Sequence, residues 1–393
     1  MADIYNRLDT TYIDLCKDKL RRYRYKLEIL DWYEFVTKEI TDELIDSGSI
    51  TINRSQGVRR SCNITLFNFD NEIEPSYSSD FWLTKKFKLW CGIEDETTGN
   101  IYWFPQGVYL TTAFNISSDH KIQITGVDKF GLFTADFGAS ILTAEHRIAR
   151  GKKITIAIRD IIRMSMGNKR LCDPIEPLFD VELFEEEVPY DISLSAGQYI
   201  GDILIELALC LGADIYYDGN GRLCVHRGTT DTNYAHKGAQ WLFDGHDVNV
   251  ISTGTNSQLS SAINMVTVTG TDDNEVHHYY TAKNTNHTSP LNIYAIGERA
   301  AATIETDMGY SDERCKEYAE YWLHKKSVLA LEVNIESIVI PHMDVDKVIM
   351  IDSDNNGDYR RYIVTSVNLP FGTIGTMSLG VTNIVDLLYY NEI

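Results

Sequence analysis

The residues best placed to bind a metal form the run Asp352-Ser-Asp-Asn-Asn-Gly-Asp358. Its first, third, fifth and sixth residues match the opening of an EF-hand loop, which surrounds calcium with oxygen ligands. The twelfth position, however, is Ile363, where that loop requires a glutamate, and the flanking segments have the alternation of strands. We interpret the run as a hairpin turn, with adventitious calcium binding as the alternative.

Histidines occur in patterns that do not fit a metal site or a catalytic triad. In a strand, the adjacent His277 and His278 would face opposite sides of the sheet, so they could not jointly hold one metal. His226 and His246 each lie near an aspartate, but no Gly-x-Ser-x-Gly nucleophile turn accompanies them. Ser195 is better explained as part of the N-cap region of the helix that follows it.

Carboxylates are plentiful, with 57 Asp and Glu residues, and a glycosidase pair could exist among them. The sequence selects no two of them. The acidic run Glu182 to Glu187 is predicted to be a solvated edge, with an electrostatic interface as the alternative. Phosphate-binding glycine motifs are missing from the sequence. We therefore predict no catalytic, cofactor-binding or metal-binding residues, and no cofactor.

The composition is that of a folded protein of two to four domains, with 393 residues of which 44% are hydrophobic and 24% charged. The formal net charge of −21 disfavours non-specific adhesion to DNA or anionic lipid. Tyrosine is frequent, at 23 residues, and suits half-buried strand faces and interfaces.

The seven cysteines are odd in number and include no Cys-x-x-Cys pair, so reduced structural thiols are expected in place of disulfides or zinc ligands. No secretory signal and no apolar run of membrane-spanning length is present, so we expect synthesis and folding in a cytoplasm and no membrane span.

Four regions are predicted from the spacing of apolar residues. Residues 1–24 form a basic N-terminal arm, solvated or in contact with an acidic neighbour such as another copy of the chain. Residues 25–134 alternate at period two and predict a first β-barrel domain. Residues 135–245 predict an α+β insertion, and residues 246–393 a second β-barrel with one packed helix at about 311–326.

Within the insertion, apolar residues at helical spacing predict helices from Ile154 and from Ile200, the second followed by Gly212 as a C′ residue. Residues 213–226 then predict a strand, a tight turn at Asp218-Gly-Asn-Gly221 and a second strand. The fold class is thus α+β, mainly β: two tube-like antiparallel β-barrels with an α+β insertion between them.

Three stretches in this order resemble one known family. They are Gly48 to Asn68 with Phe104-Pro-Gln-Gly-Val-Tyr109 and Ile122-Gln-Ile-Thr-Gly-Val-Asp128 after it, Ile200 to Leu223, and Tyr362 to Leu379. The chain resembles the central hub, or tail-tip, proteins of long-tailed bacteriophages and contractile injection systems, over about residues 24–385. The resemblance implies a structural virion protein without catalysis, in which three copies form a pseudo-sixfold ring of tube-like barrels.

The resemblance also implies the partners. They are the chain itself as a homotrimer, a tail tube or distal tail protein on one side, a spike or tip protein on the other, and the tape-measure protein as a further candidate. DNA would only pass through the channel during genome ejection, and the protein would reside in the baseplate of the virion tail.

Two alternatives stay open at this point. One is a carbohydrate-binding or host-recognition tail protein, favoured by Trp82, Trp90 and Trp103 on predicted β-structure. The other is a glycoside hydrolase whose acid pair the sequence does not reveal.

Overall fold

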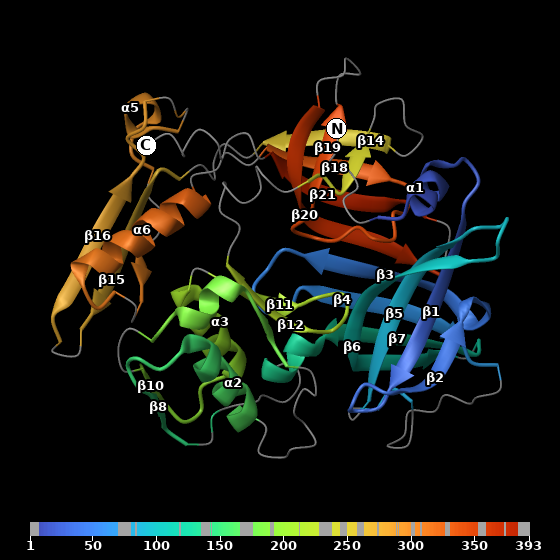
Figure 1. Ribbon diagram of the computed structural model, residues 1–393, viewed down its shortest axis with the longest axis horizontal. Coiled ribbons are helices and arrows are strands. Elements are labelled where there is room, and N and C mark those ends of the chain that lie inside the picture. The colour runs from blue at the N-terminus through green and yellow to red at the C-terminus, as the bar shows by residue number, and fades with distance from the viewer. Residues whose placement is uncertain are drawn as a thin grey trace.

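The structure is a computed structural model of the 393-residue chain, and it is mainly β with few helices (Figure 1). It describes residues 8–69, 80–82, 85–117, 119–134, 142, 144–165, 176–188, 192–211, 213–227, 238–243, 250–257, 263–272, 275–287, 289, 291–299, 303–306, 309–326, 331–352, 359–372 and 375–383. The predicted class, α+β and mainly β, is confirmed. Closure of the two barrels stays a prediction.

The first β module begins after a short helix, α1 (Thr10–Lys17), and consists of seven antiparallel strands. They are β1 (Arg22–Leu30), β2 (Val36–Thr41), β3 (Ile45–Asn53), β4 (Arg60–Phe67), β5 (Lys86–Glu94), β6 (Ile101–Ser117) and β7 (Lys121–Asp128), with the 3-10 turns η1 (Asp42–Leu44) and η2 (Lys129–Phe133). Their spatial order is β2-β1-β5-β6-β7-β4-β3. Alternation places residues such as Ile50, Ile64 and Ile124 in the core while their neighbours face outward.

The insert packs two helices against a small sheet. Its elements are β8 (His146–Ile148), α2 (Ile154–Ser165), β9 (Leu178–Phe179), η5 (Val181–Glu185), β10 (Ile192–Leu194), α3 (Ile200–Cys210), β11 (Ala213–Tyr217) and β12 (Leu223–Arg227). Both helices and the β11–β12 hairpin form where the sequence predicts them. The apolar faces of α2 and α3 meet in a core of their own, which the aromatic rings of η2 also enter. Gly212 lies outside the described residues.

The second β module is built from β13 (Trp241–Phe243), β14 (Val250–Ser257), β18 (Leu331–Ser337), β19 (Val348–Asp352), β20 (Tyr359–Phe371) and β21 (Met377–Asn383). β14, β18, β21 and β20 pair antiparallel in that order, and β19 pairs with β20. Asp352 pairs with Tyr359 across β19 and β20, so the run between them connects two antiparallel strands, as a hairpin requires. Residues 353–358, which carry most of the calcium-like run, lie outside the described residues.

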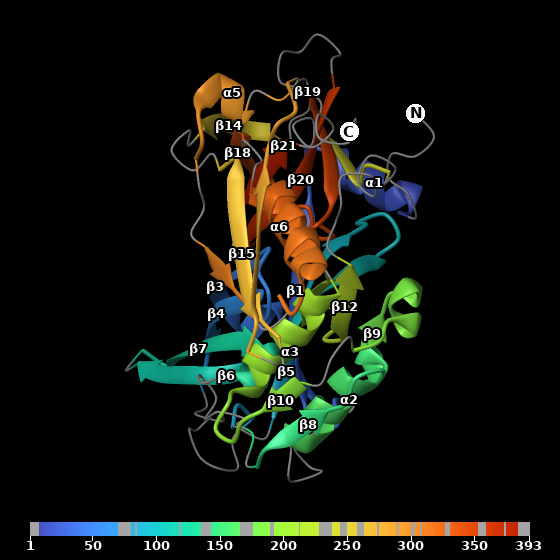
Figure 2. The same ribbon diagram turned by 90° about the vertical axis from the view of Figure 1, so that its left-hand side faces the viewer.

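A separate lobe interrupts the second module. It contains β15 (Met265–Thr271), β16 (His277–Lys283), α5 (Ile293–Ile296), β17 (Ile304–Glu305) and α6 (Asp312–Lys326). The predicted helix is confirmed, and Ser311 caps it through its Oγ, which accepts the Arg314 N–H at 3.2 Å. Helix α6 packs on β15 and β16 and not on the large sheet, with Cys315 and Ala319 buried against Val266 (Figure 2).

Strand β20 joins the two β modules into one 13-stranded sheet. Its last part, Ser366–Phe371, pairs with Asn53–Gly48 of β3. Segments 48–68 and 362–379, which stand out in the sequence for their alternation, therefore meet edge to edge. One continuous hydrophobic core covers residues from both modules. No helix among the described residues is long and apolar enough to cross a membrane.

Candidate functional site at the junction of the β modules and the insert

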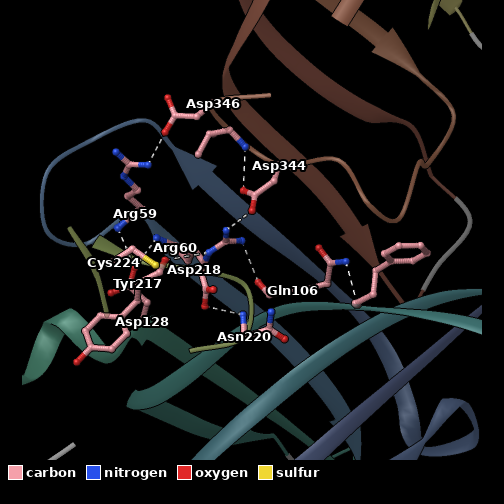
Figure 3. Close-up of polar contacts among 12 residues, drawn as sticks. Arg59, Arg60, Gln106, Asp128, Tyr217, Asp218, Asn220, Cys224, Asp344 and Asp346 are labelled. Carbon is pink, nitrogen blue, oxygen red and sulfur yellow. Dashed lines mark hydrogen bonds and ion pairs between the residues drawn. The ribbon is translucent and has the colours of Figure 1, made fainter. Parts of the chain in front are cut away.

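Two adjacent arginines, Arg59 and Arg60, mark the point where both β modules and the insert meet (Figure 3). They stand at the start of β4 and are 3% and 2% exposed. Both backbone N–H groups donate to Asp128 Oδ2, at 2.8 and 2.9 Å, and Phe130 N donates to Asp128 Oδ1 at 3.0 Å. Burial raises the pKa of Asp128 to about 6, against the lowering effect of these N–H donors.

The Arg59 side chain connects the first module to the other two parts. Its Nη1 donates to Asp346 of the second module at 2.7 Å, and its Nη2 lies 3.5 Å from Asp214 of the insert. The guanidinium carbon stands 3.5 Å from the centre of the Tyr216 ring, a stacking contact. Arg54 reaches the other oxygen of Asp346 at 2.6 Å. One carboxylate thus holds two arginines of the first module.

Arg60 makes the second set of connections. Its Nη2 donates to Asp344 at 2.6 Å, its Nη1 to the Gln106 carbonyl at 3.2 Å, and its Nε to the Tyr217 carbonyl at 3.5 Å. Gln106 Nε2 in turn donates to the Pro341 carbonyl at 2.7 Å. Burial alone would lower the pKa of Arg60, but nearby negative charge, chiefly that of Asp344, raises it.

The β11–β12 turn docks the insert onto the first module. Asp218 Oδ1 accepts the N–H groups of Asn220 and Arg222 at 2.9 and 2.8 Å, which shapes the turn. Gly221 has φ +78°, and a Cβ there would lie 2.5 Å from Val108 Cγ2 of β6. A glycine is therefore required both by the backbone conformation and by the close approach.

A second set of buried charges surrounds Glu34 in the turn between β1 and β2. Its Oε1 lies 2.8 Å from Lys86 Nζ and 2.5 Å from Lys129 Nζ, and both lysine side chains are fully buried. Lys86 stands over the Trp32 ring and Lys129 over the Tyr217 ring. Glu34 has φ +68°, a conformation that a residue with a side chain adopts only when its surroundings hold it there.

Helix α1 is attached to the second module through a buried aromatic cluster. The Tyr12 hydroxyl lies 2.7 Å from His342 Nδ1, and the Tyr12 ring packs on Phe104. The Trp241 ring also lies near His342, with the ring centroids 5.6 Å apart. Burial lowers the pKa of His342 to about 4, so the ring is neutral at pH 7.

The residues singled out in the sequence stay apart in the structure. His226 lies 3.0 Å from Asp180, and His277 lies 3.1 Å from Thr271. His278 instead lies 2.9 Å from Asp312 on α6, so the two neighbouring histidines have separate partners. His246 lies outside the described residues.

Ser195 and the acidic run also take structural positions. The Ser195 backbone N–H donates to Gln198 Oε1 at 3.0 Å, within the turn before α3. In the acidic run, Glu185 forms an exposed ion pair with Lys153 at 2.7 Å, while Leu183 and Val188 anchor the run in the core of the insert. No group of three potential metal ligands occurs among the described residues.

The last part of the basic run near the N-terminus, from Arg22 to Lys26, forms ion pairs within the chain. Arg24 contacts both Glu94 at 2.6 Å and Asp42 at 3.1 Å, and Lys26 lies 2.8 Å from Glu28. Arg24 and Lys26 belong to β1, so the basic run is part of the first module's sheet from Arg22 onward.

Two of the tryptophans named for carbohydrate binding, Trp90 and Trp103, lie beside a lysine of β1. Lys26 Nζ lies 5.0 Å from the centre of the Trp90 ring and 5.2 Å from that of Trp103. Trp90 Nε1 donates to Glu28 at 2.7 Å. Each of these two rings therefore has a cation over one face, a contact within the protein that competes with a sugar there.

Buried cysteines in the described part of the chain behave as apolar side chains. Burial raises the pKa of Cys16 and of Cys224 to about 12, so both thiols are protonated at neutral pH. Cys172 lies outside the described residues.

The junction was not predicted from the sequence, although a signal was present. Arg59-Arg60 interrupts an otherwise alternating segment, and Asp344-Val-Asp346 supplies two carboxylates close together in sequence. Their pairing joins residues more than 280 positions apart, which no local pattern encodes. Chemically, the junction places each carboxylate against a cation or N–H donors, an arrangement that fixes parts of the protein relative to one another.

The fold is that of phage tail proteins. The tail protein from Neisseria meningitidis MC58 superimposes with a TM-score of 0.62 at 11% identity, over 93% of this chain and 98% of that chain. The 43 kDa tail protein from prophage MuSo2 of Shewanella oneidensis gives a TM-score of 0.61 at 12% identity, over 93% and 99%. A chain of the Francisella PdpA-VgrG complex gives 0.53 at 9% identity, over 96% and 61%.

Sequence comparisons add one family model. Residues 288–388, from α5 to the end of β21, match a family described as a domain of unknown function (DUF5048). No curated protein matches the chain. The resemblance to tail proteins inferred from short sequence stretches is therefore confirmed by the fold of nearly the whole chain.

Proposed function

We propose that the protein is a structural hub of a virus tail tip or baseplate, in which three copies form a ring around a channel. The observation that carries the proposal is the edge-to-edge pairing of β3 and β20, which makes two β modules parts of one long sheet. A chain that already joins two such modules supplies two sixths of a pseudo-sixfold ring, so three copies would complete it.

The long sheet also offers two edges for contacts between copies. Strand β6 pairs with β5 only as far as Tyr109, and its distal part is paired with β7 alone among the described residues. Figure 2 shows this β6–β7 hairpin projecting from the body of the molecule. Strand β14 is the last strand in the order on the side of the second module, and it pairs only with β18 in the described part of the chain. Head-to-tail pairing of unlike edges is the geometry that closes a ring.

The proposed partners follow from this position in a tail. They are two further copies of the chain, a tail tube or distal tail protein on one face of the ring and a spike or tip protein on the other, with the tape-measure protein as a further candidate. DNA passes through the channel during ejection without binding, which the net charge of −21 favours through repulsion. The protein is made in the host cytoplasm and resides in the virion tail.

The proposal includes no catalysis. The carboxylates of the junction, buried Asp128 and partly exposed Asp344 and Asp346, are held by arginines or backbone N–H groups, and the contacts described for them include no second carboxylate of the kind that glycosidases use.

Electron cryomicroscopy of the purified chain and of the assembled particle tests the proposal. We expect a ring with threefold symmetry, six β modules around a central channel, and a mass of three chains in solution at high protein concentration. A single copy of the chain at the tail tip would refute the ring.

A further inference from the structure

A groove lies beside the turn between β1 and β2, away from the sheet edges assigned to the ring. It has a volume of about 640 Å³ and runs between this turn and the β11–β12 turn of the insert. Leu30 and Val108 form its apolar floor, and Lys88 and Arg222 line it. Glu28 and Glu34 line the groove as well, but each lies beside lysines outside the lining. Lys88 and Arg222 are thus the lining charges that form no ion pair in the described part of the chain.

The aromatic rim of the groove is held out into solvent by a rigid turn. Tyr33 is 56% exposed and Phe35 71% exposed, although large aromatic side chains are usually buried. Asp31 accepts the Phe35 N–H through its side chain at 2.9 Å and the Glu34 N–H through its carbonyl at 3.0 Å. The turn is therefore fixed from within.

Glu34 is anchored inside the protein between the two exposed aromatic residues. Glu34 stands between Tyr33 and Phe35 in sequence, and its carboxylate is held inside by Lys86 and Lys129. Glu34 has φ +68°, and its two neighbours, Tyr33 and Phe35, are both exposed. Exposed aromatic residues with little freedom left to lose are the side chains that contribute most to protein interfaces.

The basic residues of the groove lack the acidic partners that other lysines and arginines of this region have. Among the described residues, neither Lys88 nor Arg222 forms an ion pair, and Lys88 Nζ instead lies 4.2 Å from the centre of the Trp90 ring. Burial lowers the pKa of Lys88, which shows that its charge is partly desolvated without full compensation. Three acids lie nearby: Glu28 and Glu34 are engaged by other lysines, and Asp218 Oδ1 accepts two backbone N–H groups of its own turn.

We propose that this groove binds an extended segment of a different protein, in which apolar side chains alternate with carboxylates. The apolar side chains would pack between Phe35 and the floor of the groove, and the carboxylates would meet Lys88 and Arg222. Charge complementarity selects this occupant, because an acidic segment would neutralise the two basic residues while a basic one would leave them unpaired. The inference goes beyond the proposed hub function and does not depend on ring formation.

The test measures binding of a fluorescein-labelled heptapeptide, Glu-Phe-Glu-Leu-Glu-Val-Glu, to the full chain by fluorescence anisotropy. A peptide with glutamine in place of each glutamate is the chemical control. We expect the acidic peptide to bind at least about tenfold more tightly than the glutamine peptide, and more weakly as salt is added.

Two variants with matched controls locate the binding. Arg222→Glu and Phe35→Ala should each weaken binding by about tenfold or more. Lys316→Glu, the same charge change on an exposed lysine of α6, and Tyr279→Ala, which removes a 70% exposed aromatic side chain on β16, should leave it unchanged. All four positions are exposed, so unchanged melting temperatures are expected.

Several outcomes would overturn the proposal. They are failure of the acidic peptide to bind, equal binding of the glutamine peptide, or equal losses in Arg222→Glu and Lys316→Glu. Light scattering supplies a further arm: if Phe35→Ala lowers the oligomeric state of the chain itself, the occupant is a second copy and not a different protein. If the chain binds the peptide but forms no ring, the groove proposal stands and only the hub proposal is refuted.

Discussion

At the scale of single residues, the junction uses charge to specify geometry. Arg59 and Arg60 are buried, yet each has carboxylates and carbonyls around its guanidinium. A buried ion pair adds little net stability compared with an apolar pair, but removing one member leaves a costly unpaired charge. We infer that the junction excludes other orientations of the three parts it connects, because any other orientation would leave Arg60 or Asp344 unpaired.

The histidine under α1 makes stability depend on pH. The pKa of His342 is lowered from 6.5 to about 4, so the unfolded chain binds a proton more readily than the folded chain between these values. The free energy of unfolding is therefore highest, as far as His342 is concerned, above about pH 6.5, and it decreases as the pH falls toward 4. Between pH 7.5 and pH 5, linkage gives a loss of about 2 kcal/mol from this residue.

His342→Gln should remove that dependence. Glutamine does not titrate, and its amide can still meet the Tyr12 hydroxyl, which lies 2.7 Å from His342 Nδ1. Urea unfolding of both proteins at pH 7.5 and pH 5 measures the effect as a difference, in which other titrating groups such as Asp128 cancel. The stability advantage of wild type over the variant should shrink by about 2 kcal/mol at pH 5. An advantage that is the same at both pH values would contradict the argument.

At the scale of elements, the β11–β12 turn decides how the insert sits on the first module. Gly221 combines φ +78° with a position 2.5 Å from Val108 Cγ2 for any added Cβ. Gly221→Ala should therefore destabilise the protein by about 2 kcal/mol or more, since it adds both backbone strain and a clash.

A matched control separates these two causes. Gly99 in the β5–β6 hairpin has φ +73°, and a Cβ there would meet nothing within 4 Å. Gly99→Ala should cost only the backbone strain, about 1 kcal/mol. Thermal unfolding of both variants measures the difference, and equal losses would show that the close approach to Val108 is unimportant.

Elements with a strong local pattern were predictable from the sequence. Helix α2 follows from apolar residues spaced three and four apart after Ile154, and the β11–β12 hairpin from Asp218-Gly-Asn-Gly221. Strand β6 runs from Ile101 to Ser117, a length that the sequence does not make evident. Pro105 and Gly107 are the reason, because both residue types are unfavourable inside strands. In the structure, a register shift between β5 and β6 at these two residues allows the strand to continue.

Contacts between distant segments were not predictable in the same way. The sequence identifies the alternating segments 48–68 and 362–379 but does not say that β3 pairs with β20, since alternation specifies a face and not a neighbour. The packing of α6 on β15 and β16 is a similar case. Its apolar face is clear in the sequence, while the sheet that covers it is set by the fold.

At the scale of the whole molecule, the unpaired edges of the long sheet can pair with strands of other molecules. An unpaired sheet edge invites pairing with any other strand, and natural proteins cover such edges or use them. The distal part of β6 projects from the body with little apolar burial, and Ile116 is 42% exposed on it. A projecting edge with an exposed apolar side chain is better explained as a contact surface than as a protected end.

The ring proposal therefore predicts the effect of a charge at this edge. Ile116→Lys should prevent ring formation, because a lysine on an edge strand would have to be buried without a partner when a second strand adds to it. Ile156→Lys, which places the same charge on the 45% exposed Ile156 of α2, should leave assembly intact. Light scattering after size-exclusion chromatography reads out the mass, with three chains expected for wild type and the α2 variant and one chain for Ile116→Lys. Because both side chains are exposed, circular dichroism should show the same fold for all three proteins. An Ile116→Lys protein that still assembles as wild type does would move the contact between copies away from the distal part of β6.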